Sequence, residues 1–261
     1  MINVLAGAFG FLGALAAHDL AAQSLHDLPL RPFVGTCPKC GTARGWSHVS
    51  CATCQRRVGR EYAVVIVSVA VAVAFAIALG PRWALLGYLG FLVLTLSLAI
   101  TDIDALRIVD RLNLRGTASV VAALGLGALA DGALPAFLRG VLGGAAYFLG
   151  TNLVFLLARG RGFGYGDVKL SVQLGVFTAF LSWGTLGWSV FLTALIGGVL
   201  SILVLVTQMI VRQRAPGVES GSAKRSLRDS MQVELPYGPS MILGSWISIY
   251  LAGIGAFPIP T

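Results

Sequence analysis

Long apolar stretches separated by short polar segments run through the whole chain. About eight of them approach the roughly 20 helical residues that are needed to cross a bilayer core about 30 Å thick. Their predicted bounds are Ile2–Leu20, Tyr62–Leu79, Trp83–Ile100, Thr117–Ala130, Leu134–Leu157, Val168–Leu181, Leu186–Val211 and Tyr237–Ala256. The pattern predicts an all-α polytopic membrane protein with about eight transmembrane helices.

The composition excludes a water-soluble domain. Of the 261 residues, 56% are hydrophobic and 11% are charged, and the mean hydropathy is +0.83, far from the values of soluble globular chains. The formal net charge of +8 comes from basic residues scattered among the connections. That distribution suits anionic lipid headgroups and argues against nucleic acid binding. The lipid bilayer is therefore the first partner that the sequence predicts.

The basic residues also predict which way the helices run. Of the 19 lysines and arginines, all except Arg82 and Arg139 follow the first, third, fifth or seventh apolar stretch. Because basic residues beside membrane helices are retained in the cytoplasm, we expect these four connections inside and both termini outside. The same count favours two helices in the apolar run 168–211, with a break at residues 182–185.

Three regions follow from this pattern. Residues 1–22 are expected to form the first transmembrane helix rather than a cleaved signal peptide, because no lysine or arginine precedes Arg31 to supply the positive n-region. Residues 23–61 are expected to form a cytoplasmic loop. Residues 62–261 are expected to form a membrane-embedded domain that carries the chemistry.

The loop at residues 23–61 holds all four cysteines of the chain. Cys37 and Cys40 form one C-x-x-C pair, and Cys51 and Cys54 form another. Two such pairs complete a tetrahedral zinc shell, whereas the alternative, a disulfide framework, is rare in a reducing cytoplasm. We therefore expect a small ribbon-like loop with a structural zinc ion, which would stabilise a segment too short to bury a core of its own.

Two aspartates stand where predicted membrane helices meet water. Asp102 ends the third apolar stretch, and Asp167, 65 residues later, precedes the sixth. A carboxyl group at that depth is costly to keep and indicates a functional site. Asp102 lies closest to hydrocarbon, where burial favours the protonated form, so it is the first catalytic candidate.

Two further acids follow Asp102. Asp104 and Asp110 share their segment with Arg107 and Arg111. They can be interfacial acids paired with the arginines, or they can orient the site around Asp102. The sequence pattern leaves both interpretations open.

A glycine-rich segment leads to the other acid. Gly164 and Gly166 precede Asp167, and glycines permit a close backbone approach, so this segment can bring a substrate backbone against the carboxylate. A phosphate-binding loop would instead end in Lys-Ser/Thr and carry no such acid. A plain helix-start carboxylate that interacts with the helix dipole remains an equal alternative.

Paired carboxyl groups suit peptide hydrolysis. Two like charges forced together do not both ionise easily, so one group stays protonated while the other is charged. The charged group accepts a proton from water, and the protonated group donates to the scissile carbonyl oxygen or the leaving amine. The sequence therefore favours membrane-embedded acid/base chemistry.

These features, in this order, resemble those of the type IV prepilin peptidases, polytopic aspartic proteases of the GxGD class. The matching elements are the four-cysteine loop, Asp102-Ile103-Asp104 with Asp110 beyond it, Gly164-Tyr165-Gly166-Asp167 running into Val168-Lys169-Leu170, and Pro236-Tyr237-Gly238-Pro239 opening the last helix. The resemblance implies that Asp102 and Asp167 are the catalytic pair. Around them we expect a second group to position the substrate, namely Gly164, Gly166, Lys169, Asp104 and Asp110.

The resemblance also implies a substrate and a location. Members cleave the short basic leader of type IV prepilins or secretion pseudopilins at the cytoplasmic face of the bacterial inner membrane. Many also methylate the new N-terminus with S-adenosylmethionine, but this chain has Gly7-Ala8-Phe9-Gly10-Phe11-Leu12-Gly13 where bifunctional members carry a Gly-Ser-Phe-Leu-Asn-like motif. Cleavage is thus the expected activity, and methyl transfer stays open.

Two alternatives belong to other classes. A transporter or channel that binds protons or cations at the same acids predicts carboxyl groups near the bilayer midplane. A zinc-ribbon scaffold without activity would tolerate the loss of either aspartate.

Overall fold

The computed structural model describes residues 1–43, 51, 53–54, 60–159, 164–213 and 237–256, and these residues form long helices. The helices are α1 (Ile2–Leu25), α2 (Arg60–Leu79), α3 (Ala84–Ala105), α4 (Asp110–Ala130), α5 (Leu134–Leu157), α6 (Tyr165–Leu181), α7 (Trp183–Gln213) and α9 (Gly238–Gly253). Apart from an isolated bridge between Thr36 and Ala43, the described residues contain no strand pairing. The predicted all-α fold with eight helices is confirmed.

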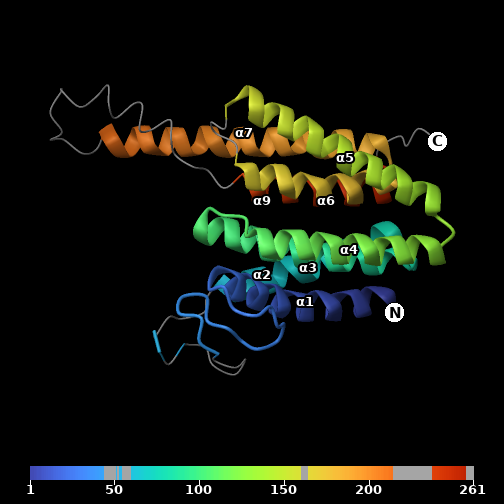
Figure 1. The fold of residues 1–261 in the computed structure, drawn as a ribbon, viewed down its shortest axis with the longest axis horizontal. Helices are drawn as coiled ribbons and strands as arrows, with labels where there is room; N and C mark the ends of the chain where they lie inside the picture. The colour runs from blue at the N-terminus through green and yellow to red at the C-terminus, as the bar shows by residue number, and fades with distance from the viewer. Residues whose placement is uncertain (44–50, 52, 55–59, 160–163, 214–236, 257–261) are drawn as a thin grey trace.

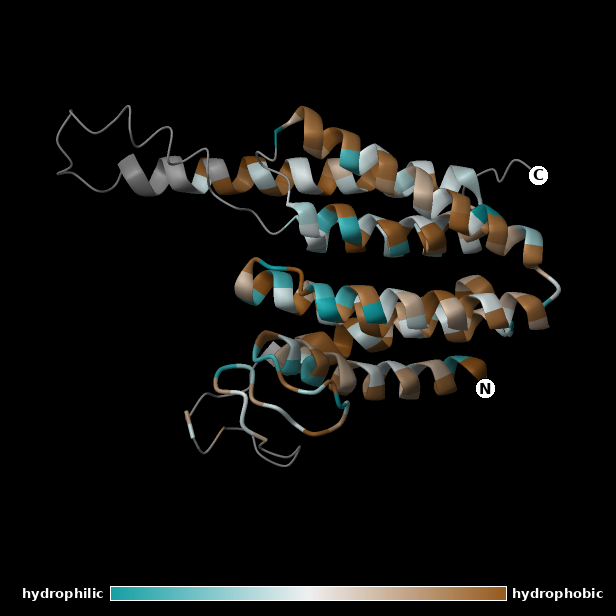
Figure 2. Cartoon of the chain, viewed as in Figure 1, coloured by the Kyte–Doolittle hydropathy of each residue, from teal (hydrophilic) through white to brown (hydrophobic). Residues whose placement is uncertain are grey.

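The helices lie side by side along one long axis (Figure 1). Six of them, all except α6 and α9, are long and apolar enough to cross a membrane. Short turns join α2 to α3, α4 to α5 and α6 to α7 at the end where α1 begins, and the cysteine loop and the α3–α4 turn lie at the other end (Figure 1). Apolar residues cover the outer faces of the bundle (Figure 2), as a lipid-facing surface requires.

Burial divides the helices into a centre and a periphery. Most residues of α3, α6 and α9 are buried, whereas only 17% of the membrane-length segment of α7 and 22% of that of α5 are buried. The two short helices α6 and α9, of 17 and 16 residues, therefore belong to the protein interior. They share that interior with α3, which carries Asp102.

Three helices extend by five residues or more beyond the bounds that the sequence pattern predicts. α1 ends at Leu25 instead of Leu20, α3 ends at Ala105 instead of Ile100, and α4 begins at Asp110 instead of Thr117. The pattern ends each stretch at polar residues, but a helix continues through them where their side chains find a partner or water. In α1, Asp19 and Gln23 are buried and bind the cysteine loop.

The predicted break between the sixth and seventh stretches is confirmed. Ser182 has an extended backbone, with φ −167° and ψ 162°, and separates α6 from α7. Its Oγ accepts a hydrogen bond of 3.0 Å from the backbone N–H of Thr185. The serine thereby satisfies one of the amide groups that the first turn of α7 leaves without a helical partner.

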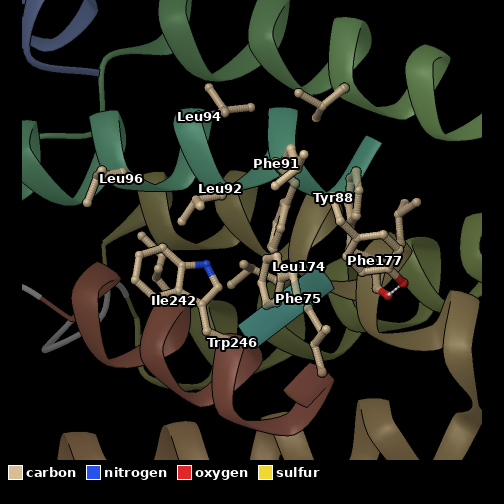
Figure 3. Packing of buried hydrophobic residues seen from close by; sticks show 14 of the residues in the cluster. Phe75, Tyr88, Phe91, Leu92, Leu94, Leu96, Leu174, Phe177, Ile242 and Trp246 are labelled. Atoms are coloured by element: carbon tan, nitrogen blue, oxygen red, sulfur yellow. Dashed lines mark hydrogen bonds between the residues drawn. The ribbon is translucent and has the colours of Figure 1, made fainter. Parts of the chain in front are cut away.

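Aromatic side chains join the central helices (Figure 3). The rings of Phe91 on α3 and Phe177 on α6 stack with centroids 4.3 Å apart, and Tyr88 meets Phe177 edge to face at 5.1 Å. The Tyr88 hydroxyl donates to the Phe177 carbonyl oxygen at 2.7 Å. Trp246 of α9 donates from Nε1 to Thr95 Oγ1 of α3 at 3.2 Å. These contacts fix α6 and α9 against α3, which positions the site at their ends.

α6 is also held closely by α5. A Cβ on Gly143 of α5 would collide with the Cβ of Ala179 on α6, so the two helices approach through small residues, as is common in membranes. At the C-terminal end of α6, the Arg139 guanidinium donates to the carbonyl oxygens of Ala179, Phe180 and Leu181 at 2.8, 2.6 and 2.8 Å. Arg139 thus satisfies carbonyls that the end of a helix leaves without partners.

Candidate active site

The two aspartates predicted from the sequence lie at neighbouring helix ends. Asp102 occupies the last turn of α3 and is 6% exposed, and Asp167 occupies the first turn of α6 and is 7% exposed. The backbone N–H of Gly238, at the start of α9, donates to Asp102 Oδ2 at 3.1 Å. Three helix ends that are far apart in the sequence therefore meet at this point.

The two carboxyl groups face the same small space. A Cβ built on Gly238 would stand 2.7 Å from Asp102 Oδ2 and 3.6 Å from Asp167 Oδ1. The two oxygens therefore lie no further apart than the sum of these distances. One water molecule, or one substrate carbonyl, can reach both groups at that separation.

Local structure explains the direction in which each aspartate points. α3 ends at Ala105 and is followed by Leu106, a left-handed residue with φ 50° whose N–H donates to the Asp102 carbonyl oxygen. At the start of α6, the N–H of Gly164 donates to Asp167 Oδ2 at 3.3 Å. A Cβ on Gly166 would stand 3.0 Å from the Ile108 side chain, so this glycine lets α6 approach the α3–α4 turn. Both glycines thus have a role in placing Asp167.

The other charged residues near the predicted site have different partners. Lys169 Nζ of α6 forms an ion pair with Asp110 Oδ2 of α4 at 2.7 Å, with 36% and 66% of the two side chains exposed. Asp110 therefore pairs with a lysine of another helix. Arg111 donates instead to the Leu28 carbonyl oxygen at 3.2 Å, so it ties α4 to the chain after α1. Asp104 is exposed, in the last turn of α3.

The four cysteines form a cluster that can hold a metal ion. One ligand atom from each residue lies within 4.8 Å of the others, and the Cys37–Cys54 and Cys40–Cys51 sulfur pairs are 3.6 Å apart. A tetrahedral zinc–sulfur shell, with bonds of about 2.3 Å, has sulfur–sulfur edges of about 3.8 Å. All four cysteines are free of disulfides. The cluster therefore fits a closed tetrahedral site.

The thiols of the cluster are unequal. Hydrogen bonds from the backbone of Cys54 and from the Thr42 side chain lower the pKa of Cys51 to about 5, which favours the thiolate, the form that binds metal. Burial raises the pKa of the Cys37 thiol to about 11. A bound metal ion would displace that proton.

One face of α1 binds the cysteine loop, a feature that the sequence analysis missed. Asp19 accepts hydrogen bonds from the backbone N–H groups of Gly35 and Thr36, at 3.0 and 2.6 Å, immediately before Cys37. One and two turns further along the same face, Gln23 binds the backbone of Arg31 and His26 Nε2 lies 3.2 Å from the Pro38 carbonyl oxygen. The available signal was three polar residues at helical spacing at the end of an apolar helix.

Fold and site together define a class of protein: a helical membrane bundle with two buried carboxyl groups that meet at one end. Residues 88–202, which include both aspartates, match the sequence profile of the type IV leader peptidase family. The resemblance to this family that the sequence predicts is confirmed over these residues.

Curated relatives cover most of the chain. The prepilin leader peptidase/N-methyltransferase of Pseudomonas aeruginosa is 28% identical over 252 residues, which span 90% of this chain and 77% of that relative. The protein of the same name from Pseudomonas putida is 28% identical over 234 residues, with 82% and 70% covered. That from Aeromonas hydrophila is 26% identical over 213 residues, with 78% and 63% covered. No solved structure matches the chain.

Proposed function

We propose that this protein is a membrane-embedded aspartic endopeptidase that cleaves the basic leader of type IV prepilins or pseudopilins. The observation that carries the proposal is the meeting of Asp102 and Asp167 beside Gly238, at the ends of three separate helices. The relatives named prepilin leader peptidase/N-methyltransferase support the choice of substrate. Both acids lie at helix ends, which supports a peptidase over a transporter with acids at the midplane.

The proposed mechanism uses the pair as one unit. Two carboxyl groups this close favour the state that holds one proton between them. The charged group takes a proton from the attacking water while the protonated group donates its proton to the scissile carbonyl oxygen, so the two groups exchange roles at the tetrahedral intermediate. When the intermediate breaks down, the newly protonated group donates to the leaving amine and the other group takes a proton from a hydroxyl of the intermediate, which restores the initial state.

The proposed orientation places this chemistry at the cytoplasmic face of the bacterial inner membrane. The described parts of the basic connections lie at the same end of the bundle as the aspartates (Figure 1), which supports that orientation through the positive-inside rule. Asp104, exposed in the last turn of α3, would attract the basic leader. The Lys169–Asp110 ion pair would border the leader path, and Gly164 and Gly166 would act through Asp167.

We further propose zinc as the metal of the cysteine cluster, held by Cys37, Cys40, Cys51 and Cys54. Bound zinc would supply a structural crosslink rather than a reactive centre, because four thiolates leave no open coordination position. Asp19 and His26 would hold the loop in place around it. The three proposed regions remain the first transmembrane helix (1–22), the cytoplasmic loop (23–61) and the membrane-embedded peptidase domain (62–261).

The relatives' names include a second activity, N-methylation. The segment 7–13 departs from the motif that bifunctional members carry at this place. Whether this chain transfers a methyl group from S-adenosylmethionine therefore needs a separate measurement. Mass spectrometry of the mature pilin N-terminus decides it, because a methylated amine has a distinct mass. This measurement uses the same processing reaction as the test of cleavage.

The test of the main proposal is processing of a prepilin in membranes that contain Asp102→Asn or Asp167→Asn. We expect either variant to lower the cleavage rate by at least about a thousandfold, since general acid and base contributions are of this order. Asp27→Asn makes the same chemical change in an exposed turn and should process normally. Full processing by either dyad variant would exclude the proposed pair.

A further inference from the structure

The beginning of α9 closes the space around the two carboxyl groups. Gly238 is buried and is the first residue of α9. The first N–H groups of a helix have no partner within the helix, and here the first of them donates to Asp102 Oδ2 at 3.1 Å. An amide that helix geometry leaves unpaired is thus used to hold one of the two aspartates.

A second hydrogen bond fixes where α9 lies along α3. Trp246 Nε1 donates to Thr95 Oγ1 at 3.2 Å, and the Thr95 hydroxyl donates in turn to the Phe91 carbonyl oxygen at 2.7 Å. The Thr95 and Asp102 acceptors lie two turns apart on α3, as do Gly238 and Trp246 on α9. The two bonds therefore set the position of an antiparallel pair of helices, and with it the position of the Gly238 amide.

The missing side chain of Gly238 matters as much as its amide. A Cβ here would stand 2.7 Å from Asp102 Oδ2 and 3.6 Å from Asp167 Oδ1, in contact with both carboxyl groups. The neighbouring Tyr237 ring packs on Gly197 of α7, where a Cβ would stand 2.5 Å from ring atom Cε2. Pro239 follows at a helix position that suits its fixed φ. The first turn of α9 is therefore held on both sides and has little room to move away.

We propose that Gly238 is a positioning residue for peptide cleavage and that the first turn of α9 is the third component of the active site. Its amide holds Asp102 in the orientation that faces Asp167, and its lack of a side chain leaves the space that a shared water needs. This inference rests on the proposed function, because it assigns Gly238 a task within the aspartate pair. It adds a residue that acts through Asp102 rather than on the substrate.

The test is steady-state cleavage of a prepilin with a short basic leader, a glycine and then an apolar helix, by the full-length chain in membranes. For Gly238→Ala we expect kcat per folded molecule to fall by at least about 100-fold, because a displacement of about 1 Å at reacting groups costs this much. KM should stay within about threefold, since the proposal assigns Gly238 a task toward Asp102 and not toward the leader. A loss of packing alone would change the amount of folded enzyme and leave kcat unchanged.

Gly244→Ala is the matched control. It adds a methyl group on the same helix, 2.8 Å from backbone and side-chain atoms of Thr193, in an equally tight place that lies away from the carboxyl groups. We expect its kcat per folded molecule to equal that of the unaltered enzyme. An equal loss of kcat in both variants would overturn the proposal, as would a normal kcat in Gly238→Ala.

Trp246→Phe decides the matter if Gly238→Ala does not fold. It leaves Gly238 intact and removes the bond to Thr95 together with part of the buried indole ring, so kcat should fall by at least about fivefold, the factor that one ordinary hydrogen bond corresponds to. An unchanged kcat would overturn the positioning role. Asp102→Asn distinguishes failure of the proposed function from failure of this inference. An active Asp102→Asn variant refutes the aspartate pair itself. An inactive Asp102→Asn variant together with a normal Gly238→Ala variant refutes only the role of Gly238.

Discussion

The four-cysteine loop and the aspartate junction are built in opposite ways. The loop gathers its four cysteines from residues 37–54 through two C-x-x-C pairs, and one ligand atom from each lies within 4.8 Å of the others. The junction gathers Asp102, Asp167 and Gly238 from the ends of α3, α6 and α9, and the Gly238–Asp102 hydrogen bond spans 136 residues. The loop depends on local spacing, and the junction depends on how three helices pack.

This difference predicts how each region fails. The loop contacts the bundle through α1 and Arg111, and none of these hydrogen bonds involves Asp102 or Asp167. Loss of a metal ligand should therefore disturb the loop more than the dyad. Loss of a helix contact that orients α6 should disturb the aspartate pair more than the loop.

The largest of the further effects should come from removing a thiolate with Cys37→Ser. We expect metal content to fall from about one ion per chain to nearly none, and the loop to become sensitive to protease, because a structural zinc ion contributes folding energy directly. Cleavage should fall by no more than about tenfold. Metal analysis, limited proteolysis and prepilin processing measure the three quantities.

Thr53→Ala is the control for this comparison, since Thr53 is exposed and lies between the second pair of cysteines. It should keep its metal and its activity. Complete loss of cleavage in a folded, metal-free Cys37→Ser protein would show that the two regions are not separate.

A smaller effect is expected from Arg139→Met, which removes three hydrogen bonds from the carbonyl end of α6. We expect the free energy of unfolding in detergent to fall by about 2 kcal/mol, the scale for hydrogen bonds to a charged group. Metal content should not change, because the loop lies at the other end of the bundle. Arg82→Met, at an exposed residue of the same end, should be neutral; equal stability of the two variants would contradict the role assigned to Arg139.

The smallest effect is expected at the Lys169–Asp110 ion pair. Its side chains are 36% and 66% exposed, and exposed pairs contribute about 0–1 kcal/mol because water and salt screen them. A double-mutant cycle with Lys169→Met and Asp110→Asn should therefore give a coupling energy below about 1 kcal/mol in unfolding experiments. If the change in KM, converted to a free energy, is much larger than this coupling energy, the pair acts on the substrate, which is the role expected for both residues from the sequence.

Some features of the fold could be predicted because they are local. The helices appear where the apolar stretches predict them, and α5 has the predicted bounds of Leu134 and Leu157. The end of α1 was predicted too early, because Asp19 looks like a polar terminus until its partners, Gly35 and Thr36, are known. The role of a polar residue within a membrane helix can be inferred only when its hydrogen-bond partner is known.

The sequence by itself determined the class of the protein, its membrane helices, the four cysteines of the loop and the two aspartates, because composition, helical length and short motif spacing are properties of consecutive residues. Only the tertiary structure decided that Asp102 and Asp167 share one space, that Arg139 closes the end of α6, and that Gly238 touches the dyad. Those relations depend on the register of helices packed side by side, which the side chains of all the helices set together.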